Sequence, residues 1–199
     1  VCQCIRQWHY TEANRNSIDM MLAVNGIPVV AIELKNQLTG QSVDDAMRQW
    51  EYNRNPKEYA FGFNKRVLAY FACDLYNVYM TTQLNGAETV FLPFNQGSNG
   101  AGKDGGAGNP TTEDGKYVTS YFWENVLQKD KLLDILQKFI SYERSEKKKI
   151  MPDGSTKTTV SSKVIFPRYH QLDVVRKLVS HVRENGAGHN YLIQHSAGS

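Results

Sequence analysis

The chain is poor in cysteine and has no long apolar run. Its 199 residues include only three cysteines, Cys2, Cys4 and Cys73, an odd number without zinc-ligand spacing. Packing roles in a reducing cytoplasm suit such residues better than a disulfide framework. No apolar run approaches the ~20 residues that a membrane-spanning helix needs, and no signal peptide is recognisable. These absences predict a cytoplasmic protein without a membrane partner.

Neither acidic nor basic residues are in large excess. The formal net charge is +3, which permits a nucleic-acid partner without requiring one. Hydrophobic residues make up 41% of the chain, and its length suffices for one domain of ordinary size with a tail or a small second unit. A Gly-Lys-Ser/Thr phosphate-loop sequence is absent, so this chain alone is not expected to bind ATP through such a loop.

The sequence does contain alternating strand and helix patterns. A helix is predicted from the N-cap Ser42 to about Asn53, before Pro56. Other helices are predicted within 117–140 and 172–184. The predicted strands are 1–10, 17–24, 27–35, 67–73, 78–83, 89–94 and 191–193. This order indicates an α/β fold with a mixed central β-sheet flanked by helices.

Two segments interrupt these patterns and suggest the domain limits. Residues of about 95–116 are rich in glycine and predict a flexible surface insertion. Residues 145–162 are basic and polar and predict a linker, with 152–154 as a turn that could form the tip of a small hairpin. The run Lys147–Lys149 could contact phosphates or be solvated. We therefore expect a domain at 1–144, a linker at 145–162 and the start of another unit at 163–199.

One apolar hairpin carries charged residues. Two β-rich runs flank Asn25-Gly26, a dipeptide typical of tight hairpin turns. Asp19 lies near the start of the first run, and Glu33 and Lys35 lie at the end of the second. Because charges seldom enter a buried strand without a partner or a metal, these residues mark a candidate site.

The turn decides whether the two carboxylates share a face of the sheet. A two-residue loop pairs Asp19 with Ile32 and points Asp19 away from Glu33. A three-residue loop with a bulge pairs Asp19 with Ala31 and brings it to the face of Glu33. We predict the three-residue loop, with Gly26 in the left-handed conformation. Without a bulge there or elsewhere in the two strands, the site could not form.

Two carboxylates on one face favour a hard divalent cation, Mg²⁺ or Mn²⁺, with Asp19 and Glu33 as metal ligands. The main-chain carbonyl of Leu34 could add a ligand. Lys35 would orient a water or stabilise the charge that develops on a phosphate during hydrolysis. The alternative is a structural ion pair at a sheet edge, in which Lys35 neutralises Glu33.

These residues resemble a known family. Asp19 followed by Glu33-Leu34-Lys35 is similar to the PD-(D/E)xK motif in the N-terminal nuclease domain of the restriction (R, motor) subunit of type I restriction-modification enzymes. The surrounding NGIPVVAIELKNQLTGQS is also similar to that family's segment. Further along, FPRYHQLDVVRKL followed by YLIQHSAGS resembles the entry to the family's superfamily 2 helicase-like motor. The two motifs in this order are far more specific than either alone.

The resemblance implies a PD-(D/E)xK restriction-endonuclease-like core with magnesium- or manganese-dependent cleavage of double-stranded DNA. The family works in complex with modification and specificity subunits. It implies metal ligation by Asp19 and Glu33 and a catalytic role for Lys35. A QxxxY motif on the following helix corresponds to Gln49 and Tyr52, which are one residue closer together in this sequence.

The same resemblance assigns the C-terminal segment to an ATP-driven motor. Gln171 corresponds to an adenine-sensing position, and Ala197, Gly198 and Ser199 open a Walker A loop in which the sequence stops. ATP would be a cofactor of the full-length subunit and not of this fragment. Two other functions stay open: a non-catalytic DNA-binding or subunit-docking module, and a structural ion-pair cluster in a protein of other function.

Overall fold

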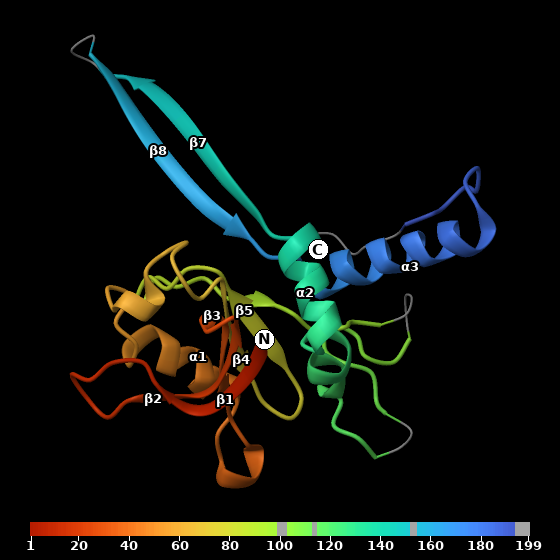
Figure 1. Ribbon diagram of the computed structural model, residues 1–199, viewed down its shortest axis with the longest axis horizontal. Coiled ribbons are helices and arrows are strands. Elements are labelled where there is room, and N and C mark those ends of the chain that lie inside the picture. Colours follow the sequence, from red (N-terminus) through yellow and green to blue (C-terminus); the bar gives the residue numbers. More distant parts are fainter. Residues whose placement is uncertain (99–102, 113–114, 152–154, 194–199) are drawn as a thin grey trace.

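The computed structural model describes residues 1–98, 103–112, 115–151 and 155–193. Among them, six strands form one sheet in the order β1-β2-β3-β4-β5-β6 (Figure 1). Their bounds are β1 (Cys2–His9), β2 (Ser17–Val24), β3 (Ile27–Leu34), β4 (Ala69–Cys73), β5 (Val78–Thr81) and β6 (Leu92–Pro93). Only β3 and β4 pair in parallel, whereas the other neighbours are antiparallel. The predicted mixed sheet is therefore confirmed.

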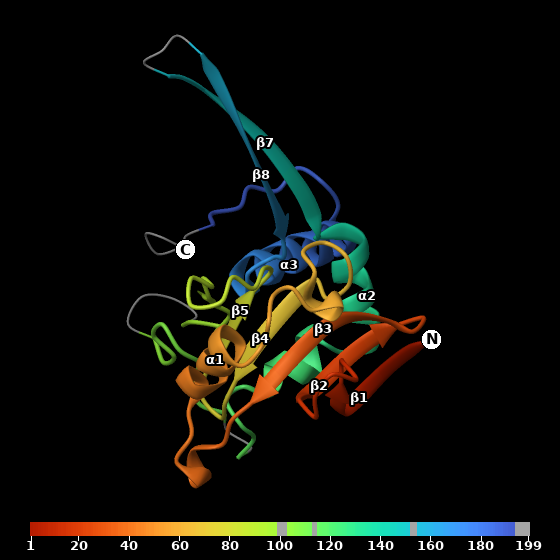
Figure 2. The same cartoon turned by 90° about the vertical axis from the view of Figure 1, so that its left-hand side faces the viewer.

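Helices cover both faces of this sheet. One face is covered by α1 (Val43–Tyr52), which connects β3 to β4, and by the short 3₁₀ turn η2 (Tyr59–Phe61). The π-helical turn η3 (Phe122–Val126), α2 (Lys129–Lys138) and the start of α3 (Tyr169–Asn185) pack on the other face. Figure 2 shows α1 and α2 on opposite sides of the strands. The α/β class predicted from the sequence is confirmed.

The start of α1 follows directly from its sequence. The Ser42 hydroxyl accepts a hydrogen bond from the Asp44 N–H at 3.3 Å, and the Ser42 N–H donates to the Asp45 carboxylate at 2.8 Å. Such a capping box satisfies backbone donors that the first helical turn leaves unpaired. On its inner face, the Trp50 indole N–H donates to the carbonyl of Phe71 in β4 at 2.9 Å, which fixes the helix on the sheet.

A buried aspartate ties α1 to the turn between β4 and β5. Asp74 is only 5% exposed. One carboxylate oxygen accepts from the N–H of Val43, the first residue of α1, at 2.8 Å. The other accepts from the N–H groups of Tyr76 and Asn77 at 2.8 and 2.7 Å. Because one carboxylate accepts hydrogen bonds from both segments, it holds the β4–β5 turn and the N-terminus of α1 together.

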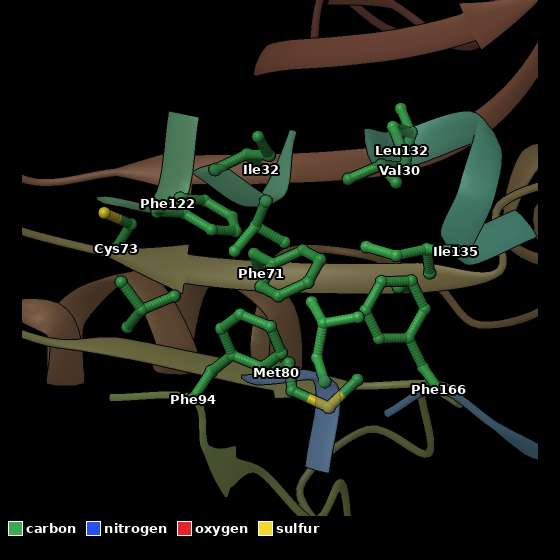
Figure 3. Close-up of a cluster of buried hydrophobic side chains, with 14 of the residues drawn as sticks. Val30, Ile32, Phe71, Cys73, Met80, Phe94, Phe122, Leu132, Ile135 and Phe166 are labelled. Atoms are coloured by element: carbon green, nitrogen blue, oxygen red, sulfur yellow. The ribbon is translucent and has the colours of Figure 1, made fainter. Parts of the chain in front are cut away.

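The larger hydrophobic cluster lies between the sheet and the helices α2 and α3. Phe71 of β4 packs against Phe94, Phe122 and Phe166, with ring centroids 4.7–5.7 Å apart, and Figure 3 shows these rings with the aliphatic residues around them. Phe166 and Leu172 belong to the segment predicted to open another unit, and both are buried in this cluster. That segment therefore shares the core of residues 1–144.

A separate two-stranded sheet follows α2. The strands β7 (Ser141–Ile150) and β8 (Thr156–Ile165) pair antiparallel along ten residues each. Both views show this hairpin projecting away from the sheet and its helices (Figures 1 and 2). The segment expected as a linker with a possible hairpin is thus a long two-stranded arm, and the predicted turn at 152–154 lies outside the described residues.

Two predicted strands differ from the structure. The strand expected at 89–94 is reduced to Leu92–Pro93, because the Thr89 hydroxyl bonds Gly86 and Asn85 and closes a polar turn. The strand expected at 191–193 is absent. There, the Tyr191 hydroxyl instead lies 2.8 Å from a ring nitrogen of His181 in α3.

The predicted insertion at about 95–116 is only partly described, since 99–102 and 113–114 are not. In its described parts, the Asn109 side chain accepts from the Gln96 N–H at 2.8 Å and donates to the Tyr76 carbonyl at 2.8 Å.

Within the described residues, no helix has both the length and the apolarity needed to cross a lipid bilayer.

Candidate metal centre and active site

The hairpin between β2 and β3 closes with a two-residue turn. Val24 pairs with Ile27, and Asn25 and Gly26 have φ angles of +51° and +81°. Positive φ at both central residues is the signature of the type I′ turn that Asn-Gly favours. The predicted three-residue loop is therefore wrong.

A bulge in β3 nevertheless brings the carboxylates to one face. The pairing changes from Ala23↔Pro28 to Leu22↔Val30, so Val29 is the extra residue. Met20 then pairs with Ile32, and the next pair in this register sets Asp19 opposite Glu33. Proline cannot donate to a strand ladder and is common at bulges. Pro28 was thus the sequence signal for the position of the bulge.

Two groups orient the Asp19 carboxylate. The N–H of Leu34 donates to one oxygen at 2.8 Å, and the Gln7 side-chain amide donates to the other at 3.1 Å. Gln7 comes from β1 and also accepts from the Ser17 hydroxyl at 2.7 Å. Its φ of +49° is rare for a residue with a side chain. This strained backbone turns the amide toward Asp19, a role that sequence reasoning missed because nothing in the alternating pattern of β1 reveals it.

Glu33 is fully buried, with 0% of its surface exposed. One of its oxygens accepts from two nitrogens of the Arg54 guanidinium at 3.0 and 2.6 Å. Burial raises the pKa of the Glu33 carboxyl, Arg54 lowers it, and the Asp19 carboxylate raises it, with a balance at about 7. The candidate site therefore holds a carboxyl that titrates near neutrality.

Arg54 is a site residue that sequence reasoning did not assign. It is 5% exposed and also donates to the Ser17 carbonyl at 2.8 Å. Its guanidinium carbon lies 5.8 Å from the centre of the Tyr10 ring. The available signal was Glu33 itself, because a carboxylate in an apolar strand needs a cationic partner. Arg54, two residues after the end of α1, provides this partner.

Gln49 of α1 links Lys35 to Glu33. The Lys35 ammonium donates to the Gln49 side-chain oxygen at 2.6 Å, and the Gln49 amide donates to the second Glu33 oxygen at 3.0 Å. The structure therefore brings together Asp19, Glu33, Lys35 and Gln49. The alternative interpretation expected an ion pair between Lys35 and Glu33. Glu33 does form an ion pair, but its partner is Arg54 and not Lys35.

Tyr52 lies farther out, 69% exposed. It lines an open hollow of about 250 Å³ together with Lys35 and Gln49, beside Arg48. The remaining lining residues are Gln41, Asp45 and Asn53. The hollow gives a ligand access to the Lys35 ammonium from solvent.

Gln171, one of the predicted ATP contacts, lies apart from this site. It is in the first turn of α3, where its side-chain oxygen accepts from the Arg168 N–H at 3.0 Å and caps the helix. Ala197, Gly198 and Ser199 lie outside the described residues.

The oxygen donors of Asp19 and Glu33 suit a hard divalent cation. Within the described ranges no group of three or more acidic, histidine or cysteine side chains surrounds a common point. Mg²⁺ commonly takes one or two carboxylates and keeps several waters, a pattern that two carboxylates fit. The hydrogen bonds from Gln7 and Gln49 to these carboxylates are of the kind that orients metal ligands.

The mixed sheet with helices on both faces makes this an α/β protein and is consistent with a restriction-endonuclease-like core. Residues 2–97 match the family model described as type I restriction enzyme R protein N terminus. They contain the whole candidate site, and this match confirms the predicted resemblance. Comparisons with curated proteins and with solved structures gave no match.

Proposed function

We propose that the domain at 1–144 is a metal-dependent endonuclease of the PD-(D/E)xK type that hydrolyses phosphodiester bonds of double-stranded DNA. It would act within the ATP-dependent type I restriction enzyme. The observation that carries the proposal is the meeting of Asp19 and Glu33 across β2 and β3, with Lys35 connected to Glu33 through Gln49. The match of residues 2–97 to the R-subunit family supports it.

Asp19 and Glu33 would hold Mg²⁺ or Mn²⁺. When bound, the ion supplies polarisation of the scissile phosphate and a water of lowered pKa. Leu34 and Gln7 keep the Asp19 carboxylate oriented through their hydrogen bonds. Arg54 stabilises the ionised form of Glu33, the form that binds a cation.

Lys35 would place its ammonium beside the reacting phosphate and stabilise the negative charge that develops there. Gln49 restrains this side chain by accepting its hydrogen bond. Tyr52 and Arg48 line the same hollow, where hydroxyl and guanidinium groups suit contacts to the DNA backbone.

The remaining partners follow from the family. The modification and specificity subunits would complete the enzyme, and recognition of the DNA sequence would lie outside this chain. ATP would bind to the motor of the full-length subunit, with Gln171 near the adenine and Ala197, Gly198 and Ser199 at the phosphates.

The test is cleavage of plasmid DNA by the assembled enzyme with ATP and Mg²⁺. Asp19→Asn, Glu33→Gln and Lys35→Ala should each reduce cutting at least 100-fold while ATP hydrolysis continues. Glu12→Gln, an exposed carboxylate before β2, is the control and should cut normally. Wild-type cutting by any of the three site variants would contradict the role of that residue.

Arg54 supports a second candidate, a non-catalytic DNA-binding or docking module in the isolated chain. Its guanidinium already neutralises Glu33. Titration of this chain with Mn²⁺ by calorimetry separates the two functions. Binding that Asp19→Asn abolishes supports the metal site, whereas duplex binding without Mn²⁺ binding supports the docking module.

A further inference from the structure

The hairpin β7–β8 exposes nearly all of its residues on both faces. All ten residues of β7 are exposed, and burial in β8 begins only at its end, near Val164. Ten residues in a strand span ~33 Å, so the arm extends far beyond the sheet, as both views show (Figures 1 and 2). An arm of this length with no core of its own is positioned for contact with another molecule.

Charge is divided unequally along this arm. In the half near the sheet, acids and bases are balanced, with ion pairs Lys163–Glu143 and Arg144–Glu146. In the outer half, the described residues 147–150 and 156–160 include no acid. Their cationic residues are Lys147, Lys148, Lys149 and Lys157. The four lysines and one acid, Asp153, give the segment 147–160 a net charge of +3.

The pairing register brings these lysines close together. Lys149 pairs directly with Lys157, and Lys147 lies two residues along on the same face. Like charges directly opposite on two strands destabilise the pair. A solvated hairpin gains nothing from that arrangement, whereas a polyanion placed against this face would relieve the repulsion.

We propose that the outer half of the β7–β8 hairpin binds the phosphate backbone of double-stranded DNA, with the two-stranded ribbon lying along a groove. A two-stranded ribbon fits the major groove of B-DNA, which is ~12 Å wide. This choice of polyanion rests on the proposed function of the chain as a DNA-cutting domain.

The distribution of donors favours DNA over an acidic protein surface. Lys147, Lys149 and Lys157 lie on one face of the ribbon, and Lys148 lies on the other. DNA places a phosphate backbone on both sides of a groove, so cations on both faces find partners, whereas a protein surface would meet only one face. Threonines in this half add hydroxyl donors of the kind that contact phosphates: Thr156, Thr158 and Thr159.

The experiment measures binding of this 199-residue chain to a fluorescein-labelled 30-base-pair duplex by anisotropy, in EDTA, from 50 to 300 mM KCl. The variant combines Lys147→Gln, Lys149→Gln and Lys157→Gln. At 100 mM KCl its Kd should rise at least tenfold. The slope of log K against log salt should become shallower by about 2.7, because ~0.9 is lost for each phosphate contact.

The matched control removes three exposed lysines from the helices on the other side of the sheet from α1. It combines Lys129→Gln, Lys138→Gln and Lys177→Gln and makes the same change in net charge. Its Kd should stay within twofold of wild type. The hairpin variant should unfold at the wild-type temperature or above, because its substituted residues are exposed and Lys149→Gln removes a repulsion. The control loses the exposed pairs Lys138–Asp134 and Lys177–Asp173 and should unfold close to the wild-type temperature, because surface ion pairs contribute little.

Wild-type affinity and salt slope in the hairpin variant would overturn the proposal. If that variant then bound the modification or specificity subunits more weakly, the arm would be a protein-docking element instead. Because EDTA excludes both metal and cleavage, this result is independent of the nuclease assay. Failure of the Asp19→Asn test would leave the DNA-arm measurement intact.

Discussion

Glu33 is subject to two opposed electrostatic effects. Burial in a dry sheet disfavours its ionised form, whereas the Arg54 guanidinium 2.6 Å away favours it. Desolvation is the largest influence, and the Asp19 carboxylate adds to it, so the pKa of Glu33 lies at about 7 instead of its usual 4.5. Neutral pH therefore lies at the point where this group changes its charge.

This raised pKa predicts that stability in EDTA decreases as the pH rises from 4.5 to 7. In that window the folded protein keeps a proton on Glu33 that the unfolded chain has released, so the contribution is complete below pH 4.5 and lost through pH 7. The change is on the order of 3 kcal/mol, at about 1.4 kcal/mol for each unit of pKa. Urea unfolding of wild type and Glu33→Gln measures it, and identical pH profiles would disprove it.

Arg54→Met removes the counter-charge of Glu33 while keeping an unbranched side chain. At pH 8 it should cost about 3–5 kcal/mol of unfolding free energy, the usual cost of leaving one buried charge unpaired. At pH 5.5, where Glu33 is largely protonated, the loss should be much smaller. Arg48→Met, exposed on α1, is the control and should change stability by under ~0.5 kcal/mol. An equal loss at both pH values would assign the effect to packing.

Single residues also explain how far the sequence could predict the site. Asp19, Glu33 and Lys35 were recognisable because charges interrupt apolar strands, whereas Gln49 was assigned through the resemblance to the family's QxxxY motif. Arg54 and Gln7 were not assigned, because each forms a hydrogen bond with a residue far away in the sequence. Arg54 reaches a residue 21 positions away, and Gln7 depends on a backbone conformation that its sequence does not favour.

Among the elements, the β2–β3 hairpin shows what local patterns can and cannot determine. Asn25-Gly26 specified the site of the turn, and the need for a shared face specified that a bulge must exist. The bulge was placed in the loop, although Pro28 is the residue that interrupts the ladder. The turn and the bulge together set the register of the two strands. The two carboxylates share a face as expected, but the bulge that places them there lies in β3 and not in the loop.

The junction between α1 and the β4–β5 turn depends on one side chain. Asp74→Ala would leave the N–H groups of Val43, Tyr76 and Asn77 without their acceptors. The expected loss is about 3 kcal/mol, because hydrogen bonds to a buried charged group are individually stronger than average. Urea unfolding gives the total, and hydrogen exchange at Val43 reports α1 directly.

Asp74→Asn serves as the comparison for this junction. Its amide oxygen can still accept from Tyr76 and Asn77, but its NH₂ group cannot accept from Val43. Exchange should therefore accelerate at Val43 more than at Asn77. A loss under ~0.5 kcal/mol in Asp74→Ala would show that the turn and the helix are held by other contacts.

At the scale of the whole molecule, the two units predicted from the sequence share one hydrophobic core. The composition changes near 163, and this change suggested the start of another unit. Phe166 and Leu172 nevertheless pack against Phe71 and its neighbours. Composition cannot reveal such long-range packing, because an apolar residue fits the core of either unit equally well.

Phe166→Ala should therefore destabilise the sheet of residues 1–144. Phe166 is 5% exposed, and truncation of a buried phenylalanine costs about 3–5 kcal/mol. Val160→Ala in the exposed part of β8, where Val160 is 47% exposed, should have little effect. Thermal unfolding followed by tryptophan fluorescence compares the two variants, since Trp50 on the inner face of α1 is buried against the sheet. A wild-type melting temperature in Phe166→Ala would mean that the two segments fold independently.

The Arg54–Glu33 pair separates the folding of the sheet from the supply of metal. Proteins whose ligands repel one another until an ion arrives unfold when a chelator removes it. Here the guanidinium provides a counter-charge from within the chain, so the strands can assemble in surroundings depleted of magnesium. The sheet can thus form before any ion binds, and the cation proposed for Asp19 and Glu33 would act as a reagent rather than as part of the architecture.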